Sequence, residues 1–178
     1  SSDLRRMKKI LLLAVMLLGS TPAYAADKEV RMQVLGAVCP SCAYGLEKKG
    51  SGTIAVYDLG GGTFDFALLE MSSGVHEIRA SISDPFLGGQ DFDRRLLDYL
   101  VFGFAKDHKI DLRQDRTALQ RLRDAVEKAK CDLSVDDEVT IDIPFIISTG
   151  TSEPLHLKRT ISRGKFEELT EDLVERTI

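Results

Sequence analysis

Three consecutive glycines at positions 60–62 stand between two runs of apolar, β-forming residues, and this segment constrains the fold most. Because glycine lacks a Cβ atom, such a segment can bend tightly and aim successive N–H groups at one anion. Thr63 adds a hydroxyl donor, and the carboxylates of Asp58 and Asp65 can organise a cation or a water beside phosphate oxygens. The pattern predicts a phosphate-binding loop made of Gly60, Gly61, Gly62 and Thr63, with an ordinary hairpin turn as the alternative.

The common nucleotide-binding loops do not fit this segment. A Walker-type loop carries a Lys-Ser/Thr pair and opens a helix, whereas residues 64–69 continue as a second strand. A Rossmann fingerprint also needs a helix directly after its glycines to hold the pyrophosphate. A glycine turn between two strands instead resembles the phosphate loops of the actin-like ATPases. Within that group, residues 54–65 resemble the DnaK (heat-shock-70) chaperone family.

Three further segments resemble the same family in the same order. Residues 87–93 resemble the segment that leads into the first helix of the second lobe of its ATPase domain. Residues 119–130 resemble its nucleotide-facing helix, and residues 165–169 resemble the helix that returns the chain toward the core. The resemblance therefore implies a partial DnaK-type nucleotide-binding domain, lobe II, over residues 43–178.

The resemblance also implies a function, namely part of an ATP-dependent chaperone in protein folding that uses ATP or ADP with magnesium and potassium. It implies that the glycine loop contacts the phosphates, that Asp58 is catalytic beside the magnesium and the attacking water, and that Asp65 lies near the monovalent cation. Glu127, Lys130 and Ser134 would contact the ribose and adenine. At position 131 the family carries arginine or an aliphatic residue against the adenine, and this chain has Cys131.

Partners follow from the same resemblance. They are the nucleotide, J-domain co-chaperones, nucleotide-exchange factors and unfolded client proteins, although no segment here resembles the client-binding domain. No segment resembles the first lobe with its catalytic lysine either, so we expect weak or undetectable ATP binding and no ATP turnover by this polypeptide in isolation. A net charge of -4, with no basic block interleaved with aromatics, argues against a nucleic-acid partner.

Taken alone, the residues of the nucleotide-facing helix favour a plainer interpretation. Glu127 and Lys130 form an i, i+3 pair on a charged helix, and such pairs are usually solvated surface. Cys131 alone indicates a small, partly buried residue. The three histidines show no metal-ligand spacing, so no chemistry is assigned to them.

The N-terminal part carries a different signal. Lys8 and Lys9 precede the apolar run 10–18, and Ala23-Tyr24-Ala25 supplies the small residues that a signal peptidase recognises. This predicts a signal peptide over residues 1–25, with residues 1–6 as an upstream extension. The run is too short for a stable membrane span, which needs about 20 apolar residues. Localisation is therefore contradictory, because the leader predicts export to the periplasm or secretion while the chaperone family is cytoplasmic or organellar.

Residues 26–48 resemble part of a heavy-metal-associated domain, with a strand, a Cys39-Pro40-Ser41-Cys42 loop and the start of a helix. Thiolates of Cys39 and Cys42 at this spacing can hold Cu(I), Hg(II) or zinc. A redox dithiol, a plain disulfide and incidental thiols remain alternatives. The alternative function is thus an exported soft-metal-binding protein in which these two cysteines carry the role.

Residues 43–49 suit both resemblances, since they fit the helix after the cysteine loop and the helix before the phosphate-loop strand. We therefore predict a chimera joined within these residues. An engineered linker at 50–52 is the second-ranked interpretation of the junction.

Periodicity predicts an α+β fold for the rest of the chain. The resemblance to the chaperone family implies that this fold is a partial actin-like ATPase lobe, after a signal-like helix and a short strand-loop-helix fragment. β-branched and aromatic runs indicate a three-stranded meander, and apolar residues at helical spacing indicate two long helices and a C-terminal helix. A β-hairpin lies between the second and third helices. The predicted strands are 53–59, 64–69, 75–81, 139–147 and 155–161, and the predicted helices centre on 92–104, 119–133 and 166–174.

Overall fold

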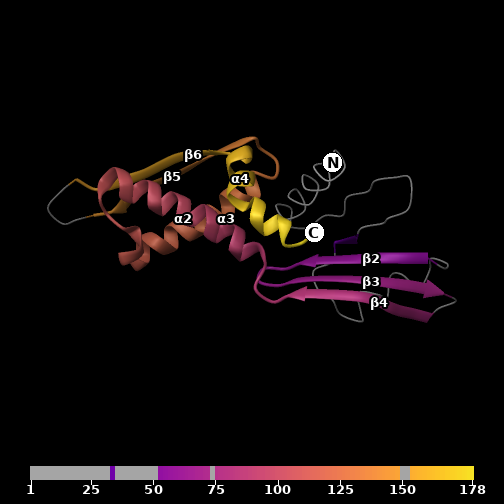
Figure 1. The fold of residues 1–178 in the computed structure, drawn as a ribbon. Coiled ribbons are helices and arrows are strands. Elements are labelled where there is room, and N and C mark those ends of the chain that lie inside the picture. The colour runs from indigo at the N-terminus through magenta and orange to yellow at the C-terminus, as the bar shows by residue number, and fades with distance from the viewer. Residues whose placement is uncertain (1–32, 35–51, 73–74, 149–152) are drawn as a thin grey trace. The chain divides into compact units, whose positions relative to one another are not determined.

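The computed structural model describes residues 33–34, 52–72, 75–148 and 153–178 (Figure 1). They fall into two compact units, a sheet unit that ends at Gln90 and a helical unit that runs from Asp91 to Ile178. The predicted signal peptide, the cysteine pair Cys39 and Cys42, and the predicted junction lie outside the described residues. Within the described ranges, no helix combines the length and apolarity that crossing a membrane requires.

The sheet unit is a four-stranded sheet in the order β1-β2-β3-β4. Its strands are β1 (Gln33–Val34), β2 (Gly52–Leu59), β3 (Phe64–Ser72) and β4 (Val75–Asp84). The antiparallel meander of β2, β3 and β4 confirms the predicted one, and β4 extends three residues beyond the predicted end at 81. The short strand β1 pairs in parallel with β2, with Gln33 opposite Val56, so it covers part of one edge of the meander.

Apolar side chains at the end of β2 and the start of β3 anchor this sheet. Tyr57 and Leu59 are buried, as is Phe64, which is the cross-strand partner of Leu59. The rings of Tyr57 and Phe64 lie 4.8 Å apart between centroids, in the tilted arrangement that aromatic pairs favour. Leu87, just after β4, is fully buried. These contacts fix the end of β2 and the start of β3, which the glycine-rich segment connects.

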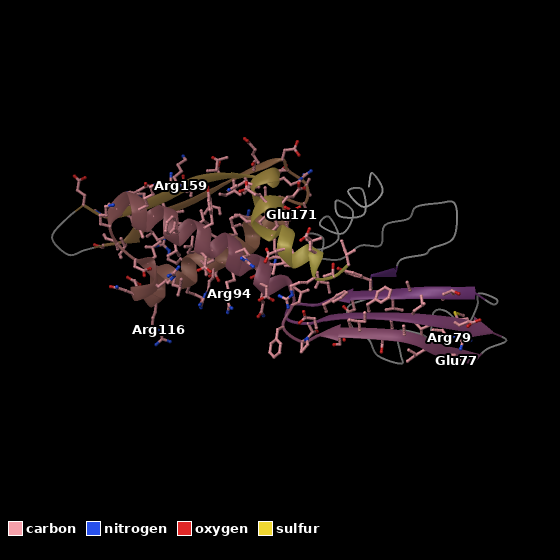
Figure 2. The ribbon with its side chains drawn as sticks, in the orientation of Figure 1. Glu77, Arg79, Arg94, Arg116, Arg159 and Glu171 are labelled. Atoms are coloured by element: carbon pink, nitrogen blue, oxygen red, sulfur yellow. The ribbon has the colours of Figure 1, made fainter. Side chains whose placement is uncertain are left out.

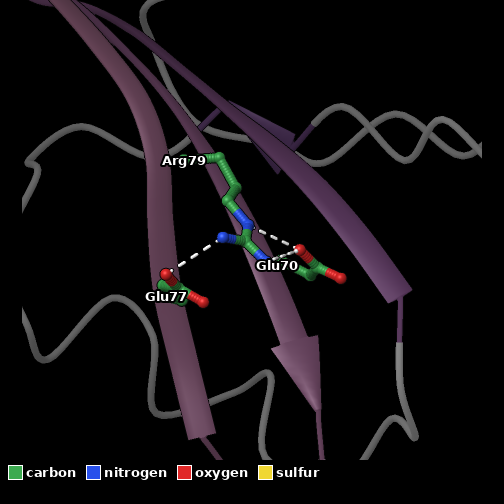
Figure 3. A network of polar contacts seen from close by, with 3 residues as sticks. All are labelled: Glu70, Glu77 and Arg79. Atoms are coloured by element: carbon green, nitrogen blue, oxygen red, sulfur yellow. Dashed lines mark hydrogen bonds and ion pairs between the residues drawn. The ribbon is translucent and has the colours of Figure 1, made fainter.

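At the opposite end of the meander one arginine offsets a like-charge pair. Glu70 of β3 and Glu77 of β4 are directly opposite each other, an arrangement that destabilises a sheet when it stands alone. Arg79 donates from Nε to Glu70 Oε2 at 2.6 Å and from Nη1 to Glu77 Oε1 at 3.0 Å (Figure 3). A register shift next to Arg79 marks a bulge in β4. The three side chains are exposed, so their net contribution to stability is small.

The helical unit contains two long helices, a β-hairpin and a C-terminal helix, as predicted. Its elements are α2 (Gly89–His108), η2 (Leu112–Gln114), α3 (Arg116–Asp132), β5 (Glu138–Ile147), β6 (Leu155–Ser162) and α4 (Arg163–Glu175). Local caps set two of the helix starts. Asp115 accepts hydrogen bonds from the amides of Thr117 and Ala118 at the start of α3, and Ser162 accepts one from Lys165 in α4.

The helices and the hairpin bury their apolar faces together, which confirms the amphipathic pattern of the sequence. Ion pairs lie around this core, and Arg159 of β6, labelled in Figure 2, pairs with Asp107 of α2. Arg116, at the start of α3, extends away from the helix (Figure 2). The buried core residues are Phe92, Leu96, Leu100, Val101, Phe104, Leu112, Ala118, Leu122, Val126, Ala129, Leu133, Ile141, Ile143, Ile146, Leu157, Ile161, Phe166, Leu173 and Val174.

Candidate functional site: a glycine loop and the C-terminal face of α3

The glycine loop, residues 60–63, connects β2 to β3. Leu59 and Phe64 form the last cross-strand pair, and the amide of Gly60 donates to the carbonyl of Thr63 at 2.8 Å. None of the three glycines has a φ between +20° and +160°. The loop is therefore not a primed hairpin turn, which requires positive φ.

Two carbonyl groups of the loop point at the start of α2. Gly60 O accepts from the amide of Gly89, and Gly61 O accepts from the amide of Gln90, each at 2.9 Å. A trans peptide group is planar, and its N–H points opposite to its C=O. The amides of Gly61 and Gly62 belong to the same peptide groups as these two carbonyls. They therefore point away from α2, side by side.

The far side of the loop is open. Within the described part of the chain, the amides of Gly61, Gly62 and Thr63 donate no hydrogen bond. A Cβ atom added at Gly61 or Gly62 would meet no heavy atom within 4 Å. The amides of Gly61 and Gly62 therefore point away from α2 and, like the amide of Thr63, have no acceptor among the described residues. Successive free donors of this kind are what an anion-binding nest requires.

The glycine that the fold itself requires is Gly88. A Cβ atom at this position would lie 2.3 Å from the nitrogen of Gly62 and 2.4 Å from the carbonyl carbon of Gly61. Real Cβ atoms do not approach backbone this closely, so only glycine lets the start of α2 reach the loop. Sequence analysis did not single out Gly88 as a site residue, although it lies in the segment 87–93 whose resemblance to the chaperone family was noted.

Two carboxylates flank the loop on one face of the sheet. Asp58 of β2 and Asp65 of β3 are cross-strand partners, and Asp58 is buried while Asp65 is half-buried. Facing carboxylates repel unless a cation or a hydrogen-bond donor lies beside them. No cluster of three or more metal-ligating side chains occurs among the described residues. Two oxygen donors suit magnesium, which keeps waters and phosphate oxygens as its other ligands.

The four predicted nucleoside residues lie on the C-terminal part of α3 and just after it. Positions 127, 130, 131 and 134 recur at helical spacing and share one face. Glu127 is exposed, and Cys131 is also exposed rather than partly buried, because its position faces outward at the helix end. Ser134 donates from its hydroxyl to the carbonyl of Cys131 at 2.6 Å.

The helical spacing of Lys130 predicted a solvated surface position, but the structure buries this side chain. It is only 7% exposed, and its ammonium lies 2.8 Å from both carboxylate oxygens of Asp93 in α2. Sequence spacing missed this pair because the partner lies on another helix. A buried lysine needs such a partner, since an unpaired charge is costly to bury.

The C-terminal end of α3 is fixed by Arg163, the first residue of α4. Its Nε donates to the carbonyl of Leu133 at 2.8 Å and its Nη2 to the carbonyl of Asp136 at 3.0 Å. The first bond satisfies the carbonyl of Leu133, the residue that caps α3, and the second fixes the turn that follows the helix. On the exposed surface of α3, a hydrogen bond to Asp132 raises the pKa of Lys128. The glycine loop lies in the sheet unit, and the α3 residues lie in the helical unit.

The fold is that of a partial actin-like ATPase lobe, with a mixed α+β composition and a glycine turn between antiparallel strands. The chain matches the family described as Hsp70 protein over residues 36–178. This match begins upstream of the predicted junction at 43–49 and includes the cysteine pair. The chain belongs to the Hsp70 family.

Three curated relatives from Deinococcus carry the name chaperone protein DnaK. The protein from Deinococcus proteolyticus is 56% identical over 135 residues, which is 75% of this chain and 21% of the relative. Those from Deinococcus deserti and Deinococcus radiodurans are each 54% identical over 135 residues, covering 75% of this chain and 22% of each relative. The chain thus spans about a fifth of the length of these relatives.

Proposed function

We propose that this chain supplies the second phosphate-binding loop and part of the adenosine-contacting helix of a DnaK-type ATPase domain, with residues 43–178 as its lobe II portion. The observation that carries the proposal is the set of three successive loop amides, from Gly61 to Thr63, that have no acceptor among the described residues. Backbone donors held in this way favour phosphate oxygens and cost little reorganisation when the anion arrives.

Roles for the flanking residues follow from their chemistry and from family membership. Asp58 would hold the magnesium and the attacking water, and Asp65 would lie near a monovalent cation. Magnesium, when bound with ATP or ADP, neutralises charge on the phosphate oxygens. Thr63 would add its exposed hydroxyl to the loop donors. The facing positions of the two carboxylates support this assignment.

The α3 residues would contact the nucleoside. Exposed Glu127 and the hydroxyl of Ser134 offer groups that can bond ribose hydroxyls or adenine nitrogens, and Lys130 would act from its pair with Asp93. Cys131 would meet the adenine with a small thiol in place of an arginine or a longer aliphatic chain. We therefore expect a weaker adenine contact at this position than a longer side chain gives.

In a complete protein of this family, J-domain co-chaperones, nucleotide-exchange factors and unfolded clients would be the partners. For this polypeptide alone we propose weak nucleotide binding and no turnover. A phosphate held by one loop in contact with bulk water gains less from each hydrogen bond than one enclosed between two lobes. No segment of the chain resembles the first lobe and its catalytic lysine.

The proposal is tested by titrating the isotopically labelled 178-residue chain with inorganic pyrophosphate and, separately, with MgADP, while recording amide NMR shifts. We expect the largest shifts at the amides of Gly61, Gly62 and Thr63. Gly61→Ala should abolish these shifts without loss of stability, because its methyl group would occupy the anion's place and touches no protein atom.

Gly103→Ala is the matched control, since an added Cβ there also meets nothing within 4 Å and the residue lies within α2, away from the loop. It should leave the pyrophosphate response unchanged. Equal shifts in the wild-type chain and Gly61→Ala would overturn the loop assignment. ATP hydrolysis by the wild-type chain that Gly61→Ala abolishes would support the loop but refute the proposed lack of turnover.

A further inference from the structure

The β5–β6 hairpin contains an irregularity that the nucleotide proposal does not use. Ile143 pairs with Leu157, and Ile147 pairs with Leu155. Residues 144–146 of β5 therefore stand opposite one residue of β6, His156. The extra residues shift the strand's alternation, so that Ile146 is buried and Phe145 is 61% exposed.

Phe145 holds an unusual backbone conformation in this bulge. Its φ is 50°, in the left-handed region that a bulky residue rarely adopts. Its amide donates to Nδ1 of His156 at 3.3 Å, and the two rings lie 4.7 Å apart between centroids. Arg121 of α3 donates to the carbonyls of Pro144 and Phe145, both at 2.8 Å. Surrounding contacts thus hold the strained residue in place.

Only one of these contacts depends on a proton. The amide of Phe145 can donate to Nδ1 only while that nitrogen carries no hydrogen, and in imidazolium both ring nitrogens are donors. We propose that protonation of His156 opens the Phe145 bulge, so that the hairpin carries a pH-sensitive clasp. After protonation, the Phe145 amide and Nδ1–H of His156 are both donors, so no hydrogen bond can join them. The contact between the two rings persists, because an aromatic face attracts a cation. The amide of Phe145 then loses its acceptor on the imidazole, which releases the strained backbone to turn.

The charged groups around this position already have partners. Arg121 from α3 faces the carbonyl side of the bulge, where it donates to the carbonyls of Pro144 and Phe145. On the hairpin, Lys158 pairs with Asp142 at 3.3 Å, and Arg159 pairs with Asp107 of α2. Helix α4 follows the opposite end of β6 from His156. Among the described groups, the hydrogen bond to Phe145 is the contact of His156 that one added proton removes.

The bulge connects the hairpin to α3. Arg121 is bonded to carbonyls of two bulge residues, so a turn of the Phe145 peptide moves an acceptor that holds this helix. The inference does not depend on nucleotide binding. It assigns an acid-responsive conformational change to the outer part of the helical unit.

The test is a pH titration of the labelled full chain by NMR from about pH 7.5 to about pH 5.5, a range in which histidines gain a proton. We expect the Phe145 amide shift and its HN–Hα coupling, which reports φ, to change with the same midpoint as the His156 ring resonances. Exchange of the Phe145 amide, corrected for its intrinsic pH dependence, should rise by about two- to tenfold as one hydrogen bond is lost.

His156→Asn keeps an acceptor at the position of Nδ1 but binds no proton, so its Phe145 signals should not respond to pH. His108→Asn is the matched control, because the ring of His108 also lies beside a phenylalanine ring, that of Phe104, at 4.4 Å between centroids. In this variant the Phe145 signals should respond to pH as they do in the wild-type chain. A Phe145 φ that stays constant while His156 titrates would overturn the inference. A pH response that persists in His156→Asn would overturn it as well.

Discussion

Gly88→Ala is expected to destabilise the protein strongly, although it adds only one methyl group. The new Cβ would lie 2.3 Å from Gly62 N, 2.4 Å from Gly61 C and 2.5 Å from Gly62 Cα. All three atoms are backbone, so no side chain can rotate to relieve the contact. Ordinary contact begins near 3.4 Å, and the loop and the start of α2 must therefore separate by about an ångström.

The magnitude follows from what this separation breaks. Overpacking of this kind costs about 1–3 kcal/mol. The hydrogen bonds from Gly89 N to Gly60 O and from Gln90 N to Gly61 O contribute about 0.5–1.5 kcal/mol each. Replacing glycine by alanine restores about 0.4–1 kcal/mol by restricting the unfolded chain. The free energy of unfolding should therefore fall by about 2–5 kcal/mol.

The assay is urea unfolding of the full chain followed by far-UV circular dichroism, comparing midpoints at a common slope. Gly61→Ala serves as the matched control. Its Cβ meets nothing within 4 Å and its φ lies outside the left-handed region, so its stability should equal or slightly exceed that of the wild-type chain. If Gly88→Ala unfolds at the wild-type midpoint, or both variants lose the same stability, the close approach of α2 to the loop is refuted.

Two further substitutions test the helical unit by the same urea assay. Asp115→Ala removes the acceptor of the Thr117 and Ala118 amides and should lower the free energy of unfolding by about 1 kcal/mol. Asp115→Asn keeps a side-chain oxygen and should retain most of the wild-type stability. An unchanged midpoint for Asp115→Ala would contradict the role of Asp115 as the N-cap of α3. Lys130→Met should cost about 2 kcal/mol by leaving the carboxylate of Asp93 largely buried without its cation, and adding Asp93→Asn should recover part of that loss. Effects of the two changes that simply add within about 0.5 kcal/mol would argue against the pair.

Periodicity was enough to predict the secondary structure where each element buries one face. The apolar spacing of Phe92, Leu96 and Leu100 predicted α2, and the β-branched runs predicted the meander. The apolar spacing did not define the first residue of α2, because Gly88 and Gly89 are poor helix formers. The structure begins the helix at Gly89, where the loop carbonyls satisfy its first amides.

Features that depend on contacts distant in sequence could not be predicted. The spacing of Lys130 indicated an exposed helix position, and its burial depends on Asp93 in another helix. A strand over 139–147 was predicted, but nothing in the sequence indicated the bulge that buries Ile146. The glycine triplet was recognised from the sequence. The direction of its amides could not be predicted, because it depends on the hydrogen bonds that the carbonyls of Gly60 and Gly61 accept from the start of α2.

The two bonds from α2 to the loop also change the electronic character of the donors. The carbonyl of Gly60 shares a peptide group with the amide of Gly61, and the carbonyl of Gly61 shares one with the amide of Gly62. When either carbonyl accepts a hydrogen bond, electron density moves toward its oxygen, and the N–H of the same peptide group becomes a stronger donor. Hydrogen bonds in such chains strengthen one another by about 10–30%. The positive end of the helix dipole is thereby transmitted through two peptide groups. If the loop binds phosphate as proposed, the two bonds from Gly89 and Gln90 would strengthen its hold on the anion.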